Sequence, residues 1–115
     1  MTSDATGLRP TDNPAAGYVY LVKNPAWPGM VKVGSAADYE QRCRKYQTGD
    51  PYRAYEVIGA LPFSDRLAAE SAVLHELRDH HVSGEWFQVS EGRALHVLQT
   101  APWEVLNELS TPPSD

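Results

Sequence analysis

Four side chains of this sequence have complementary chemistry although they lie far apart in the chain: Tyr20, Lys32, Arg42 and Glu70. A phenol can handle a proton, an ammonium and a guanidinium can hold an anion, and a carboxylate can bind a cation. Tyr20 and Lys32 each lie in a short extended string, and a basic helix containing Arg42 follows soon after. We expect the two strings to form paired strands that carry Tyr20 and Lys32 toward a common point near the helix of Arg42.

Glu70 has the most unusual position of the four. On a predicted helix, Leu67 lies three residues before it, and Val73 and Leu77 lie three and seven residues after it, which places the carboxylate within an apolar stripe. A carboxylate there must be paired, protonated or bound to a metal, because desolvating a lone charge is unfavourable. Two interpretations stay open: a metal ligand, or a residue at the stripe's edge that reaches solvent or pairs with an arginine such as Arg66.

The helix around Arg42 carries a basic and aromatic face. Tyr39 lies three residues before Arg42, and Lys45 and Tyr46 lie three and four residues after it. Such a face suits a phosphate with its flanking sugar or base. The alternative is an ordinary solvated helix face. Similarly, a strand tyrosine such as Tyr20 is often packing material.

Three strands must position these residues. Tyr18–Val22 and Met30–Val33 are rich in β-branched residues and flank a turn-forming Asn24–Gly29 segment, which predicts a hairpin with a long loop. Tyr55–Leu61 is apolar enough for a third strand, and Pro62 limits its length.

Helices should follow the strands. Asp38 and Gln41 resemble a capping box that starts a helix ending near Tyr46. Ser64 or Asp65 caps a second helix that runs to about His80. Further helical stretches are expected at 94–98 and 103–109, with a break near Pro102. The predicted fold is α+β, a small three-stranded antiparallel sheet flanked by helices. The expected organisation is a flexible segment at 1–16, one domain at 17–109 and a flexible tail at 110–115.

Composition limits the class of protein. The 115 residues suffice for one domain, and no apolar run approaches the length that spans a bilayer. No secretory signal is visible, so we expect a cytoplasmic protein without membrane contact. A single cysteine, Cys43, excludes an internal disulfide or a multi-cysteine zinc site. The net charge of −5 argues mildly against a polyanion ligand, although the positive charges gather between Lys23 and Arg53.

The order of these parts resembles the GIY-YIG nuclease superfamily from Gly17 to about Val89. Tyr18-Val19-Tyr20 is similar to its GIY element, and Val31-Lys32-Val33-Gly34 is similar to its YIG element, with Lys32 where the motif has a tyrosine. Arg42 and Glu70 fall at the family's arginine and metal-binding glutamate. Together with Gln47-Thr48-Gly49 and Gly84-Glu85-Trp86-Phe87, the pattern is most similar to a branch of small phage and bacterial members.

The resemblance implies a DNA endonuclease that hydrolyses phosphodiester bonds and leaves a 5′ phosphate and a 3′ hydroxyl. Glu70 would hold Mg²⁺ or Mn²⁺, Tyr20 would orient or deprotonate the attacking water, and Arg42 would stabilise the phosphate oxygens. Lys32 would lower the pKa of Tyr20. The residues expected to contact DNA are Lys23, Arg42, Lys45 and Tyr46. His75 is expected to have a structural role or to form a supporting hydrogen bond near the site, and Glu85 could assist the metal ion.

Two other functions remain open at this point. The same fold could be a catalytically inactive nucleic-acid-binding or regulatory module, since no clear equivalent exists for the asparagine that many members place after the glutamate. A protein-interaction or small-molecule-binding domain would instead show Glu70 paired to an arginine and Tyr20 pointing into the core. No added recognition module is visible, so specificity would come from the domain itself, from a homodimer or from a larger complex.

Overall fold

The computed structural model describes residues 14–110, with side chains placed for residues 14–104. The elements in chain order are β1 (Gly17–Lys23), β2 (Met30–Ala36), α1 (Tyr39–Thr48), β3 (Glu56–Phe63), α2 (Arg66–Glu76), η3 (Arg78–His80), β4 (His81–Ser83), β5 (Trp86–Gln88) and α3 (Glu91–Ser110). Every helix in this part of the chain is too short or too polar to cross a bilayer.

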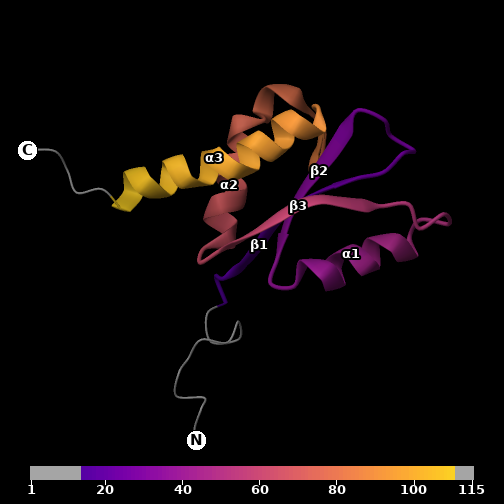
Figure 1. Cartoon of the computed structure of the whole chain (residues 1–115), viewed down its shortest axis with the longest axis horizontal. Coiled ribbons are helices and arrows are strands. Elements are labelled where there is room, and N and C mark those ends of the chain that lie inside the picture. The colour runs from indigo at the N-terminus through magenta and orange to yellow at the C-terminus, as the bar shows by residue number, and fades with distance from the viewer. Residues whose placement is uncertain (1–13, 111–115) are drawn as a thin grey trace, which may run out of the picture.

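The strands form one antiparallel sheet in the order β3-β1-β2-β5-β4. Figure 1 shows α1 on one side of the sheet and α2 and α3 on the other. The predicted hairpin of β1 and β2 is confirmed, with Tyr20 directly opposite Gly34 in the register. This central pair therefore contributes side chains to two separate helix layers.

Alternation along β1 divides its side chains between the two layers. Val19 and Leu21 join the main apolar core with α2 and α3, whereas Tyr20 and Val22 face α1 and pack near Cys43. All four strand residues are fully buried. The period of two in the sequence thus builds two hydrophobic clusters from a single strand.

The prediction of a three-stranded sheet is wrong, although the α+β class is right. The two additional strands, β4 and β5, have three residues each and form a small hairpin around Gly84, whose φ is 57°. All three residues of β4 are exposed. Such short strands carry no detectable apolar alternation, and they exist because β5 pairs with β2 at Met30–Lys32.

The predicted starts of α1 and α2 are more accurate than the predicted end of α2. Asp38 accepts a hydrogen bond from the Gln41 amide at 3.0 Å, and Asp65 accepts one from the Ala68 amide at 3.1 Å, so both predicted N-caps are confirmed. However, α2 ends at Glu76, and a 3₁₀ turn replaces its expected last turn.

The predicted helix break near Pro102 is also wrong. The helix α3 runs continuously from Glu91 to Ser110 with Pro102 inside it. Proline removes one hydrogen bond from a helix interior. Pro102 is fully buried, and its neighbour Ala101 belongs to the main core, so packing compensates for that loss.

The flexible ends predicted at 1–16 and 110–115 fall largely outside the described residues. Residues 14–16 do lie within the described part and are held by Arg66 at the start of α2. Its side chain donates to the carbonyls of Pro14 and Ala16 at 2.7 and 2.9 Å, and its amide donates to that of Ala15 at 2.8 Å. The chain is therefore anchored just before β1 begins.

Candidate active site

Tyr20 reaches from β1 toward α1 and is fully buried. Its hydroxyl forms a 2.6 Å hydrogen bond with the hydroxyl of Tyr46, which is half-buried on α1. A buried hydroxyl needs such a partner, because an unpaired one is costly to desolvate. The two tyrosines therefore form a hydroxyl pair that leads from the buried sheet face to the surface of α1.

Gly34 makes room for the Tyr20 ring. A Cβ added at Gly34 would overlap the Tyr20 hydroxyl and the ring carbon that bears it. The φ of Gly34 is not positive, so glycine is required here for space rather than for backbone conformation. The string Val31-Lys32-Val33-Gly34 and the phenol are thus parts of one packing arrangement.

The pKa of Tyr20 is raised, whereas the sequence analysis expected Lys32 to lower it. Burial is the largest cause, and the hydrogen bond and charge of Tyr46 add to it, while the positive charge of Arg42 opposes the rise. A phenol that loses contact with water and acts as a hydrogen-bond partner holds its proton more tightly. The expected low pKa is therefore wrong for the protein without substrate.

Lys32 interacts with Tyr46 rather than with Tyr20. Its ammonium lies 5.5 Å from the Tyr46 ring centroid and 5.7 Å from that of Trp86. It also forms an ion pair with Glu85 at 3.5 Å. Register explains these neighbours, because Lys32 lies opposite Trp86 in the pairing of β2 with β5.

Arg42 is exposed on α1 and lines a cavity of about 250 Å³. The cavity's other charged or polar lining residues are Asp38, Gln41, Lys45 and Arg66. Three cationic side chains and one carboxylate therefore line this cavity. Guanidinium groups bind phosphate oxygens well because their donors form a planar fork.

Glu70 lies on α2 and faces β2. The Ser35 hydroxyl donates a 2.9 Å hydrogen bond to its carboxylate. Burial raises the pKa of Glu70 most strongly, the Ser35 hydrogen bond lowers it, Glu85 raises it, and Arg66 and Arg42 lower it. The carboxylate is therefore within electrostatic reach of Arg66 on its own helix, Arg42 on α1 and Glu85 in the turn between β4 and β5.

One of the residues predicted to form the apolar stripe around Glu70, Leu67, is not part of the buried face of α2. Leu67 is 59% exposed, and the buried face of α2 is made by Ala69, Ala72, Val73 and Leu77. Glu70 consequently lies at the border of the packed face, half-buried, with its carboxylate directed to Ser35.

The edge of β2 beyond Val33 is not paired with another strand in the described part of the chain. The strand β5 pairs with β2 only at Met30–Lys32, and the Val33 amide extends this pairing to the Glu85 carbonyl at 3.0 Å. Beyond that point no described strand covers this edge of β2. Arg42, from the α1 side, acts electrostatically on both Tyr20 and Glu70, although these two residues belong to opposite faces.

Comparison with protein families gives one match. The model of the T5orf172 domain matches residues 17–101, which include every element from β1 into α3. The chain belongs to the T5orf172 domain family. This phage-associated domain is related to nuclease-type folds. No curated protein and no solved structure matches the chain.

Several of the predicted site residues of the T5orf172 domain influence one another electrostatically. The charge of Arg42 opposes the rise in the pKa of both Tyr20 and Glu70, and Glu85, which forms an ion pair with Lys32, raises the pKa of Glu70. Within residues 14–104, no group of three or more histidine, cysteine, aspartate or glutamate side chains could hold a metal ion.

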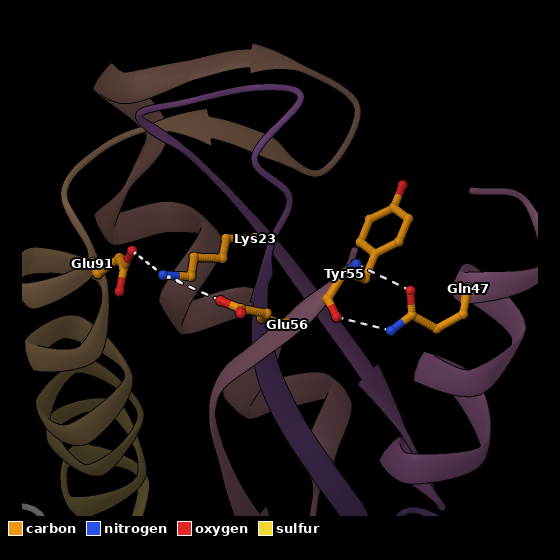
Figure 2. Close-up of polar contacts among 5 residues, drawn as sticks. All are labelled: Lys23, Gln47, Tyr55, Glu56 and Glu91. Atoms are coloured by element: carbon orange, nitrogen blue, oxygen red, sulfur yellow. Dashed lines mark hydrogen bonds and ion pairs between the residues drawn. The ribbon is translucent and has the colours of Figure 1, made fainter. Parts of the chain in front are cut away.

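Two predicted residues lie elsewhere in the T5orf172 domain. Lys23 forms ion pairs with Glu91 at 2.7 Å and Glu56 at 3.4 Å on the face that carries α3, as Figure 2 shows. His75 is exposed near the end of α2, where its carbonyl accepts a hydrogen bond from Arg78. Neither residue contributes to the arrangement around the open edge of β2.

The sequence analysis missed Ser35 as the partner of Glu70. A usable signal existed, because alternation along β2 places Ser35 on the same face as the core residues Val31 and Val33. The analysis also missed that Tyr46 is the partner of Tyr20. That contact joins residues 26 positions apart and depends on how α1 packs across the sheet.

Proposed function

We propose that this T5orf172 domain is an endonuclease that hydrolyses DNA phosphodiester bonds with the help of one divalent cation at Glu70. The observation that carries the proposal is the arrangement around the open edge of β2, where Arg42 acts on both the buried phenol of Tyr20 and the carboxylate of Glu70. A module that only binds phosphate has no use for a half-buried carboxylate in this place. The GIY-YIG resemblance and the relation of the T5orf172 domain to nuclease-type folds support the same conclusion.

The phosphate would bind in the cavity beside α1. Arg42 would direct its donors to the non-bridging oxygens and stabilise the charge that develops there during the reaction. Lys45 lines the same cavity and would hold a neighbouring phosphate. Both side chains are exposed on α1, so a DNA strand can reach them without rearrangement of the sheet.

The residues around Glu70 fit a hydrated divalent cation. Burial and the negative charge of Glu85 both disfavour a second unneutralised carboxylate there, and a cation would relieve this repulsion. Magnesium commonly keeps several waters and takes only one or two protein carboxylates. When bound, Mg²⁺ or Mn²⁺ would supply a Lewis acid beside the 3′ oxygen that leaves.

The tyrosine pair would position the attacking water. The raised pKa of Tyr20 opposes a standing phenolate, so its hydroxyl, held by Tyr46, would orient the water through a hydrogen bond. As the water oxygen forms a bond to phosphorus, the proton of the water would pass to bulk solvent. The bond to the 3′ oxygen would break at the same time, and that oxygen would take a proton from solvent. The products are a 5′ phosphate and a 3′ hydroxyl.

The test is DNA cleavage by the wild-type chain and by a matched pair of glutamate variants. Plasmid, branched and single-stranded DNA are incubated with Mg²⁺ or Mn²⁺. Glu70→Gln should lower the cleavage rate by about 10²-fold or more. Glu76→Gln, which alters an exposed glutamate on the same helix, should leave the rate unchanged. Equal rates for wild type and Glu70→Gln would remove the mechanism.

A nucleic-acid-binding module without catalysis is the second candidate. The raised pKa of Tyr20 favours it, since the phenol is a poor base before substrate binds. Binding to DNA without cleavage under all conditions above would select this alternative.

A further inference from the structure

Four aromatic rings from four separate segments meet next to the proposed reaction site. They are Trp27 from the β1–β2 loop, Tyr46 from α1, Tyr55 from the segment before β3, and Trp86 from β5. Ring centroids lie 5.4 Å apart for Trp27 and Trp86, 6.4 Å for Trp27 and Tyr55, and 5.5 Å for Tyr46 and Tyr55. We call these four residues the aromatic platform.

The aromatic platform keeps contact with solvent despite its internal packing. Trp27 is 49% exposed, and the other three rings are half-buried. If Trp27 only packed the loop against the sheet, neighbouring residues would bury most of its side chain. Tilted aromatic rings that keep part of their surface exposed are typical of surfaces on which nucleobases stack.

A positive charge joins the aromatic platform to the proposed site. The Lys32 ammonium lies close to the rings of both Tyr46 and Trp86. Tyr46 in turn bonds to the Tyr20 hydroxyl, so one end of the platform is part of the proposed reaction site. An apolar protein partner would not require this cation, whereas a nucleotide presents a flat base and a negative phosphate together.

A hydrogen-bond network fixes the loop that carries Trp27. Asn24 is 4% exposed; its side-chain oxygen accepts from the Ala26 amide at 2.9 Å, and its side-chain nitrogen donates to Asp50 at 2.8 Å. The Trp27 amide donates to the Asn24 carbonyl at 2.9 Å. The Trp27 loop is therefore fastened to the segment that leads to Tyr55.

The segment before Tyr55 is fixed as firmly. Asp50 accepts from the amides of Tyr52 and Ala54, both at 2.9 Å. Figure 2 shows that the Gln47 side chain donates to the Tyr55 carbonyl at 2.8 Å and accepts from its amide at 3.0 Å. Two loops held in this way present their rings with little loss of conformational entropy on binding.

We propose that the aromatic platform binds unpaired nucleobases and thereby directs the site to single-stranded or locally unpaired DNA. This inference rests on the proposed function for its substrate. Bases within a duplex stack on one another and present only their edges, so the platform can stack only with bases that have left the helix. The base would stack on Trp27 and its neighbours, and the adjacent phosphate would lie near Lys32.

Binding is measured in EDTA, which separates it from cleavage. The probes are a fluorescein-labelled oligothymidylate and a hairpin duplex of equal length, followed by fluorescence anisotropy. Trp27→Ala should weaken oligothymidylate binding about tenfold, since one lost stacking contact is worth about 1–3 kcal/mol. Trp27→Phe keeps a ring and should retain most of the binding. Trp103→Ala is the matched control, because Trp103 is 47% exposed but lies on α3 against Phe63.

The results distinguish this inference from the proposed hydrolysis. Equal oligothymidylate affinities for Trp27→Ala and Trp103→Ala would overturn the inference, as would a wild-type chain that prefers the hairpin or binds neither probe. Binding that depends on Trp27 while no DNA is cut with Mg²⁺ would support the platform and reject the hydrolysis. DNA cleavage with Mg²⁺, together with oligothymidylate binding that does not depend on Trp27, would support the hydrolysis and reject the platform.

Discussion

The two faces of the sheet are built from different chemistry, and the face under α2 and α3 carries the larger buried cluster. Leu21 and Tyr20 are neighbours on β1, both fully buried, and they point to opposite faces. The face under α2 and α3 is a continuous apolar core, mostly aliphatic, with Phe63 and Phe87 as its aromatic members. The face under α1 contains a phenol with a hydrogen-bond partner, and α1 itself buries only Cys43 among its residues.

Because of this difference, the face under α2 and α3 contributes mainly to stability, and the face under α1 carries the proposed catalytic groups. Aliphatic packing against α2 and α3 supplies most of the hydrophobic stabilisation. The helix α1 packs on the sheet through tyrosines and leaves Arg42 and Lys45 exposed. Substitutions on the two faces should therefore affect stability and activity in opposite proportions.

The largest change in stability is expected from Leu21→Ala on the core face. Deleting a fully buried leucine side chain should lower the free energy of unfolding by about 2–5 kcal/mol. Urea denaturation followed by circular dichroism measures this loss. The comparison fails if Leu21→Ala is less destabilising than Tyr20→Phe.

A smaller loss is expected from Gly34→Ala on the α1 face. The added methyl group overlaps the Tyr20 ring, and such overpacking destabilises by about 1–3 kcal/mol. The loss should shrink when Tyr20→Val removes the ring, which a double-mutant cycle would show as coupling. Gly92→Ala is the control, since nothing lies within 4 Å of a Cβ there. Additive effects of Gly34→Ala and Tyr20→Val would show that the ring and the glycine are independent.

Tyr20→Phe should reduce stability by only about 0.5–1.5 kcal/mol, because it removes one hydrogen bond and keeps the packed ring. Its effect on the rate of DNA cleavage should be much larger in proportion, because the Tyr20 hydroxyl would no longer orient the attacking water. The free energy of unfolding and the rate of DNA cleavage, measured on the same preparation, give the two effects. A variant that cleaves DNA at the wild-type rate would assign Tyr20 to packing alone.

The smallest change in stability is expected from Glu70→Gln, which should stabilise the folded state slightly. The folded-state pKa of Glu70 lies above its unfolded value, so the ionised carboxylate disfavours the folded state at neutral pH. Without divalent cation, Glu70→Gln should therefore melt slightly above the wild type at pH 7. The difference should vanish below about pH 4, where the carboxyl is protonated in both states.

Adding Mg²⁺ should raise the melting temperature of the wild type and leave that of Glu70→Gln unchanged. Thermal melts at several pH values with and without Mg²⁺ measure both effects. A Glu70→Gln variant that responds to Mg²⁺ as the wild type does would place the cation elsewhere.

Signals from residues close together in the sequence predicted much of the fold. They failed for elements that depend on contacts with distant segments. Both N-caps, the central hairpin and the α+β class followed from residues that are near one another in sequence. The strands β4 and β5 could not be predicted, since each has three residues and depends on the edge of β2. The helix through Pro102 was missed because only burial in the core explains why a proline is tolerated there.

The sequence by itself determined which chemical groups were available and which face of each strand they occupy. A phenol, a guanidinium and a carboxylate were visible from residue types, and the period of two in β1 separated Tyr20 from Leu21. Only the tertiary structure decided their environments. The pairing of Tyr20 with Tyr46, the contact of Glu70 with Ser35 and the open edge of β2 arise from packing between distant segments. Burial and neighbouring charges set the direction of a pKa shift, and neither is encoded in the spacing of residues along the chain.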